Sequence, residues 1–123
     1  MAATKSNTNI SAGTWQSGSV TTSGTSLAVS TSSDYADCLY ISIANGTGTY
    51  TTGGTFYVNQ SPDGSTWYAG PTYTAGLTAS TTYYWQIALD PTCEKVEVVW
   101  AVGTGSSTPT WTIGIQLGQV TAV

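Results

Sequence analysis

Apolar and polar residues alternate with a period of two along much of the chain. In one of the clearest segments, Leu39, Ile41 and Ile43 fall on one face, and polar or small residues fall on the other. Alternation of this kind is typical of β-strands that are buried on one side. The segments with the clearest alternation are 37–44, 83–89, 95–102 and 109–118. Apolar residues do not recur at helical spacing over any useful window, so we predict strands and no helix.

Weaker alternation at 14–20, 25–31, 54–60 and 66–74 brings the expected number to about eight strands. Turns rich in Gly, Ser, Asn and Pro separate these segments. Short strands at this spacing predict an all-β fold, a single antiparallel β-sandwich of the immunoglobulin-like or jelly-roll kind, with a small barrel as the alternative. We assign residues 15–123 to this domain and predict a flexible N-terminal arm over residues 1–14, which are polar and without period.

Charge is scarce in this chain. Only 7% of the 123 residues are charged and the net charge is -4, whereas roughly 25% of residues are charged in an ordinary soluble protein. Without a basic surface, binding to nucleic acid or to anionic lipid is not expected. No apolar run is long enough to span a bilayer, and the polar N-terminus does not resemble a signal peptide, so we expect the chain to stay in the compartment where it is made.

The sequence offers little catalytic chemistry. It contains no histidine, which removes the commonest general base and most zinc sites. The six carboxylates fall in expected turns or on the exposed face of a strand. We therefore predict no enzyme activity and no cofactor. Calcium is the one metal worth naming, at Asp34 and Asp37, but no EF-hand spacing is present and we assign no metal site.

Cys38 and Cys93 are the two cysteines, and their spacing matches no metal or redox motif. An oxidising compartment would permit a single disulfide between them. A cytosolic origin favours two buried thiols.

The aromatic residues divide between the two faces of the expected strands. Trp85, Trp100 and Trp111 lie on apolar faces and are expected in the core. A face of Tyr, Thr, Gln and Asn suits either a carbohydrate platform or a protein contact, and the shortage of charge favours the protein contact. The residues that we select for such an interface or ligand face are Tyr40, Tyr57, Trp67, Tyr68, Tyr73 and Tyr84.

The segment SPDGSTWY, residues 61–68, has the chemistry of a tight turn. Pro62 presets the backbone for the first central position of the turn, and Asp63 and Gly64 suit the following ones, including a positive φ. We expect a hairpin with Trp67 packed in the core. The alternative is a loop that presents its aromatic side chains to a ligand.

The longer stretch FYVNQSPDGSTWY, residues 56–68, resembles a hairpin found in β-sandwich proteins of tailed-phage virions, among them head decoration proteins and tail-associated modules. A similar hairpin occurs in discoidin-type domains that bind carbohydrate or lipid. The phage resemblance implies many copies of the chain on a capsid or tail, held by contacts between subunits.

From these observations we predict a non-enzymatic virion protein of a bacteriophage, made in the host cytoplasm. The expected role is capsid decoration, with the major capsid protein or another virion protein and further copies of the chain as partners. Placement on the capsid or on the tail stays open. The alternatives are a carbohydrate-binding module that uses exposed Tyr and Trp side chains, and a self-assembling extracellular filament subunit.

Overall fold

The computed structural model describes residues 4–9, 19–20, 24–25, 29–30, 36–106 and 111–122, with side chains described for 38–105 and 111–119. Within these ranges every element is a strand, and all strand pairs are antiparallel. No helix in the described part of the chain is long and apolar enough to cross a membrane. The predicted all-β, antiparallel sandwich is confirmed.

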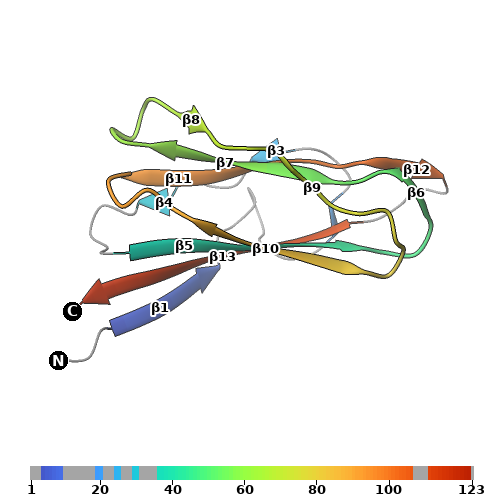
Figure 1. The fold of residues 1–123 in the computed structure, drawn as a ribbon, viewed down its shortest axis with the longest axis horizontal. Helices are drawn as coiled ribbons and strands as arrows, with labels where there is room; N and C mark the ends of the chain where they lie inside the picture. The colour runs from blue at the N-terminus through green and yellow to red at the C-terminus, as the bar shows by residue number, and fades with distance from the viewer. Residues whose placement is uncertain are drawn as a thin grey trace.

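Two sheets form the layers of the sandwich (Figure 1). Sheet one runs in the order β1-β13-β5-β10, with β2 also paired to β13. Its strands are β1 (Thr4–Asn9), β2 (Ser19–Val20), β5 (Ala36–Asn45), β10 (Thr82–Ala88) and β13 (Trp111–Ala122).

Sheet two runs in the order β3-β11-β7-β8, with β4 also paired to β11 and β9 to β7. Its strands are β3 (Gly24–Thr25), β4 (Val29–Ser30), β7 (Thr55–Ser61), β8 (Tyr68–Ala69), β9 (Tyr73–Thr74) and β11 (Lys95–Ala101). A separate two-stranded ribbon joins β6 (Thr49–Thr52) to β12 (Thr104–Ser106). The thirteen strands in the described part of the chain exceed the expected eight because several of them are only two residues long.

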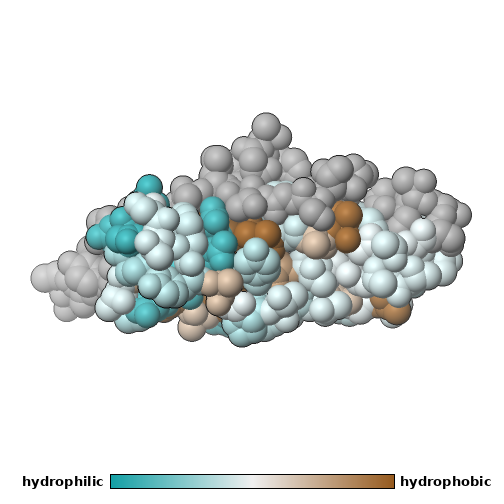
Figure 2. All heavy atoms as spheres, turned by 90° about the horizontal axis from the view of Figure 1, so that it is seen from above, coloured by the Kyte–Doolittle hydropathy of each residue, from teal (hydrophilic) through white to brown (hydrophobic). Residues whose placement is uncertain are grey.

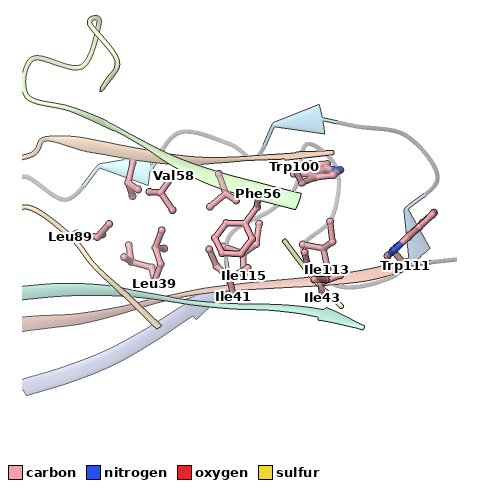
Figure 3. Close-up of a cluster of buried hydrophobic side chains, with 14 of the residues drawn as sticks. Leu39, Ile41, Ile43, Phe56, Val58, Leu89, Trp100, Trp111, Ile113 and Ile115 are labelled. Atoms are coloured by element: carbon pink, nitrogen blue, oxygen red, sulfur yellow. The ribbon is translucent and has the colours of Figure 1, made fainter. Parts of the chain in front are cut away.

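The core lies between the two sheets, and the period-two pattern builds it (Figure 3). Leu39, Ile41 and Ile43 of β5 all point inward and are almost completely buried, as the sequence predicted. Phe56 of sheet two meets Trp85 of sheet one edge-on, with ring centroids 5.0 Å apart. Trp100 and Trp111 are buried, and Trp85 is half-buried and packs against the core.

The N-terminal segment differs from the expectation. Residues Thr4–Asn9 form β1 and pair with β13 along Gln116–Ala122, so this part of the predicted arm is a strand of sheet one. A strand at the edge of a sheet is held by backbone hydrogen bonds, and these leave no periodic apolar signal in the sequence. The rest of the predicted arm lies outside the described residues.

Candidate ligand-binding site

The turn after β7 is organised by the carboxylate of Asp63. Its Oδ1 accepts hydrogen bonds from the backbone nitrogens of Ser65 at 2.8 Å and Thr66 at 2.7 Å, and from the hydroxyl of Ser61 at 3.1 Å. These bonds favour the charged form, the two backbone bonds most strongly, and they lower the pKa of Asp63 from 3.8 to about 2. Gly64 adopts a φ of 81°, which confirms the expected positive φ.

This turn closes a hairpin between β7 and β8, in which Gln60 pairs with Tyr68. Tyr68 is 64% exposed. Trp67 is half-buried and is not part of the buried core. The expectation of a core Trp67 is therefore wrong, because the residue directly precedes β8, the strand at the edge of sheet two.

The connection from β10 to β11 lies beside this hairpin. Gln60 accepts a hydrogen bond of 2.7 Å from the backbone nitrogen of Asp90 through its Oε1, and Glu94 N donates to Ser61 O at 2.7 Å. Asp90 Oδ1 accepts two bonds of 2.8 Å from Thr92, one from the backbone and one from the hydroxyl. The hairpin and the connection are thus tied together by backbone and side-chain bonds.

A pocket of about 340 Å³ lies between the hairpin and this connection. Its lining residues are Gln60, Pro62, Tyr68, Ala69, Gly70, Asp90, Thr92 and Cys93. None of these eight side chains is cationic, and Asp90 is the one carboxylate among them. The face of the molecule on the side of sheet two is otherwise mostly polar, with small, separate hydrophobic patches (Figure 2).

Three features of the pocket can recognise a ligand. The backbone and side-chain hydrogen bonds from Thr92 lower the pKa of Asp90, so its carboxylate is a fixed hydrogen-bond acceptor. Gln60 Oε1 accepts from Asp90 N, and because Nε2 has no partner among the described residues, it offers two donors to a ligand. Tyr68 adds an aromatic ring at the rim, exposed enough to stack on a flat apolar surface.

Tyr40 and Tyr84 form a second aromatic group, on the outer face of sheet one. They are 43% and 78% exposed. Tyr84 pairs with Ser42, and Tyr40 pairs with Gln86, so the two tyrosines are diagonal neighbours on adjacent strands.

The two remaining candidates have other surroundings. Tyr73 stacks on Phe56 with centroids 5.1 Å apart and packs against the core. Tyr57 is half-buried on the outer face of sheet two, opposite Val99 of β11. The structure therefore brings Tyr40 and Tyr84 together and places Tyr68, but not Trp67, at the pocket. It leaves Tyr57 and Tyr73 apart from both places.

Sequence reasoning missed Gln60, Asp90 and Thr92 as pocket residues. The sequence Asp90-Pro91-Thr92 indicates a turn, and within it the backbone nitrogen of Thr92 donates a hydrogen bond to the carboxylate of Asp90. Nothing local indicates that this turn meets Gln60, which lies 30 positions earlier in the chain.

The described residues contain no group of three His, Cys, Asp or Glu side chains that could hold a metal ion. Asp34 lies outside the described residues, and of Asp37 the backbone alone is described. Cys38 is half-buried and Cys93 is buried, and the two thiols do not form a disulfide with each other.

No protein-family model matches the chain, and no curated protein matches it in sequence. Solved structures do match its fold. The K3 cleaved adhesin domain of Lys-gingipain from Porphyromonas gingivalis is 12% identical, with a TM-score of 0.55 over 95% of this chain and 73% of the other.

Two carbohydrate-binding modules match over almost the whole chain. The C-terminal family 6 module of LamC, a laminarinase from Zobellia galactanivorans, has a TM-score of 0.50 and 12% identity over 93% of this chain and 99% of that chain. A mutant family 29 module, solved in complex with mannohexaose, has a TM-score of 0.50 and 10% identity over 99% of this chain and 94% of that chain. At these identities the likeness shows a shared β-sandwich fold.

The prediction of a capsid decoration protein is wrong by these comparisons, because carbohydrate-binding modules recur among the matching structures and support the carbohydrate-binding alternative better. The physical argument behind that prediction, a shortage of charge, does not separate a protein contact from a contact with a neutral sugar. Both kinds of contact use a surface with few charged side chains.

Proposed function

We propose that this domain binds a neutral carbohydrate without altering it, in the pocket between the β7–β8 hairpin and the β10–β11 connection. The observation that carries the proposal is the position of the exposed Tyr68 ring beside Asp90 and Gln60, whose polar groups are already held by hydrogen bonds. The fold that the chain shares with the family 6 and family 29 modules supports the same function.

The aromatic ring suits the apolar face of a sugar. The axial C–H groups of a pyranose form a flat patch that packs against an aromatic side chain, and burial of such a patch is favourable in water. Tyr68 is held at its base by β8, which pairs with β7, so little backbone freedom is lost on binding.

The polar groups suit sugar hydroxyls, which both donate and accept hydrogen bonds. Asp90 accepts from one hydroxyl, and Gln60 Nε2 donates to a neighbouring one. The bond that Thr92 N donates to Asp90 Oδ1 and the bond that Asp90 N donates to Gln60 Oε1 hold these groups before the ligand arrives. A carboxylate without a cation among the lining residues repels uronic acids and sulfated sugars, so the ligand is neutral.

The two carboxylates of this region support binding without catalysis. Hydrolysis of a glycoside needs a general acid whose pKa is raised. The pKa values of Asp63 and Asp90 are both lowered, and both side chains hold turns.

Isothermal titration calorimetry with mannohexaose, laminarihexaose and cellohexaose tests the proposal. We expect one of these neutral sugars to bind, and Tyr68→Ala to weaken that binding by roughly tenfold or more. Tyr57→Ala, on the outer face of sheet two away from the pocket, is the matched tyrosine control. A wild-type protein that binds none of a wider panel of neutral glycans would overturn the proposal.

A further inference from the structure

Where β10, β5 and β13 form it, the outer face of sheet one consists of small, hydroxyl, amide and tyrosine residues. Across β10, β5 and β13 the strand register aligns four rows of three outward positions each, which we call the sheet-one face. The rows are Thr82–Ala44–Thr112, Tyr84–Ser42–Gly114, Gln86–Tyr40–Gln116 and Ala88–Cys38–Gly118. None of these twelve residues is charged, and none is a branched aliphatic residue, Met, Phe or Trp.

From this face we propose a second carbohydrate-binding site, which takes an internal stretch of a long neutral polysaccharide lying across the strands. The inference rests on the proposed function for the class of ligand, but it uses residues that do not line the pocket. Tyr84 and Tyr40 are the two stacking rings, and Gln86 and Gln116 supply the hydrogen-bonding amides.

Neither Tyr84 nor Tyr40 belongs to the core cluster or packs against it. Tyr84 is 78% exposed in the middle of β10 and Tyr40 is 43% exposed in β5. As diagonal neighbours on adjacent strands, the two residues lie roughly 7–8 Å apart, with their Cβ atoms somewhat closer. Two rings at this spacing can contact successive parts of one extended ligand.

The amides flank one of these rings in a single row. Gln86 and Gln116 are both exposed and pair with Tyr40 from its two sides. Each amide offers donors and an acceptor, as a sugar hydroxyl does. A ligand stacked on Tyr40 would therefore meet hydrogen-bonding groups on either side of the ring.

The neighbouring row carries only small groups beside Tyr84. Ser42 and Gly114 occupy it, and Ser42 Oγ fills the space over Gly114, since a Cβ atom added there would lie 2.7 Å from it. A ligand stacked on Tyr84 would therefore meet the Ser42 hydroxyl and no bulky side chain in this row.

The composition also separates a sugar from a protein partner. The centre of a protein–protein interface is more apolar than the surrounding surface, whereas this face has hydroxyl, amide and small side chains around its two rings. The absence of charge from the twelve positions disfavours nucleic acid and acidic polysaccharides, which need cations. A neutral polysaccharide fits the remaining chemistry.

Affinity gel electrophoresis with glucomannan, laminarin or hydroxyethylcellulose in the gel tests the second site. The experiment compares the wild type with Tyr84→Ala, Tyr40→Ala, Tyr68→Ala and the control Tyr57→Ala, after circular dichroism has verified that each is folded. We expect Tyr84→Ala and Tyr40→Ala to weaken polysaccharide binding by roughly tenfold and to leave hexasaccharide binding in the pocket within about twofold.

The outcomes separate the two sites. If Tyr84→Ala and Tyr40→Ala retain full affinity for every polysaccharide that the wild type binds, the second site is overturned and the pocket stands. If polysaccharide binding depends on Tyr84 while Tyr68→Ala changes nothing, the second site stands and the pocket falls. A wild type that is a dimer by sedimentation and becomes a monomer in Tyr84→Ala would make the face a contact between copies, and would also overturn the inference.

Discussion

The side-chain amide of Asn45, at the end of β5, donates a hydrogen bond of 3.0 Å to the backbone oxygen of Gly76. The same Nδ2 group donates to Thr78 O at 3.0 Å, and Tyr83 of β10 accepts a 3.3 Å bond from Thr78 N. Asn45 is 4% exposed, so the donating amide is shielded from water. They fasten the connection that leads into β10, the strand that carries Tyr84.

Asn45→Ala removes both of these bonds and leaves two carbonyl oxygens without their donor. We expect a loss of about 2–3 kcal/mol in the free energy of unfolding, measured by urea denaturation. Asn59→Ala is the matched control, because Asn59 makes a partly exposed bond of 3.1 Å to Glu97 Oε1. An equal effect of the two substitutions would show that burial of the Asn45 bonds adds nothing.

Phe56 connects the two sheets through its contacts with Tyr73 and Trp85. Its side chain is 1% exposed. Phe56→Ala should cost about 3–5 kcal/mol of stability, because a large buried ring is replaced by a cavity. Thermal unfolding measures the effect. Tyr73→Phe keeps the stacked ring and should change stability by under about 0.5 kcal/mol; a large loss there would mean that the hydroxyl of Tyr73, and not the ring contact, holds this region.

Asp63 makes stability dependent on pH in the acid range. Because hydrogen bonds lower its pKa from 3.8 to about 2 in the folded protein, its contribution is complete above the unfolded value and is lost as the pH falls towards the folded value. We expect Asp63→Asn, which keeps an acceptor oxygen, to be less stable than the wild type at pH 7 and nearly as stable at pH 2. Urea unfolding at several pH values measures the difference, and a constant gap down to pH 2 would contradict this role for the charge.

Gln60→Glu separates ligand binding from structure at the pocket. Glu keeps an oxygen that accepts from Asp90 N, so the melting temperature should change little. It loses the two Nε2 donors and places a second carboxylate beside Asp90, so we expect carbohydrate affinity to fall by roughly tenfold. Calorimetry with the hexasaccharide that binds best is the measurement. Unchanged affinity would remove Gln60 from the proposed site.

The alternation of apolar and polar residues made the sandwich predictable. Each inward residue of β5, β11 and β13 could be named because a side-chain period of two leaves one choice of face. The turn at 62–64 was equally predictable, because it depends on local features. The Asp63 carboxylate accepts hydrogen bonds from residues two and three positions later, and Gly64 adopts a positive φ. Strand β1 was not predicted, because the pairing of an edge strand with its neighbour depends on backbone hydrogen bonds and not on the pattern of side chains.

By itself the sequence determined the all-β fold, the inward and outward positions of the long strands, and the shortage of charge that makes a neutral partner reasonable. Only the tertiary structure decided which outward residues become neighbours. Gln60 meets Asp90, and Tyr40 meets Gln86 and Gln116, through pairings between strands far apart in the chain. The physical reason is that strand order and register are set by how two sheets close over a shared core, and that choice leaves no trace in the local pattern of any one strand.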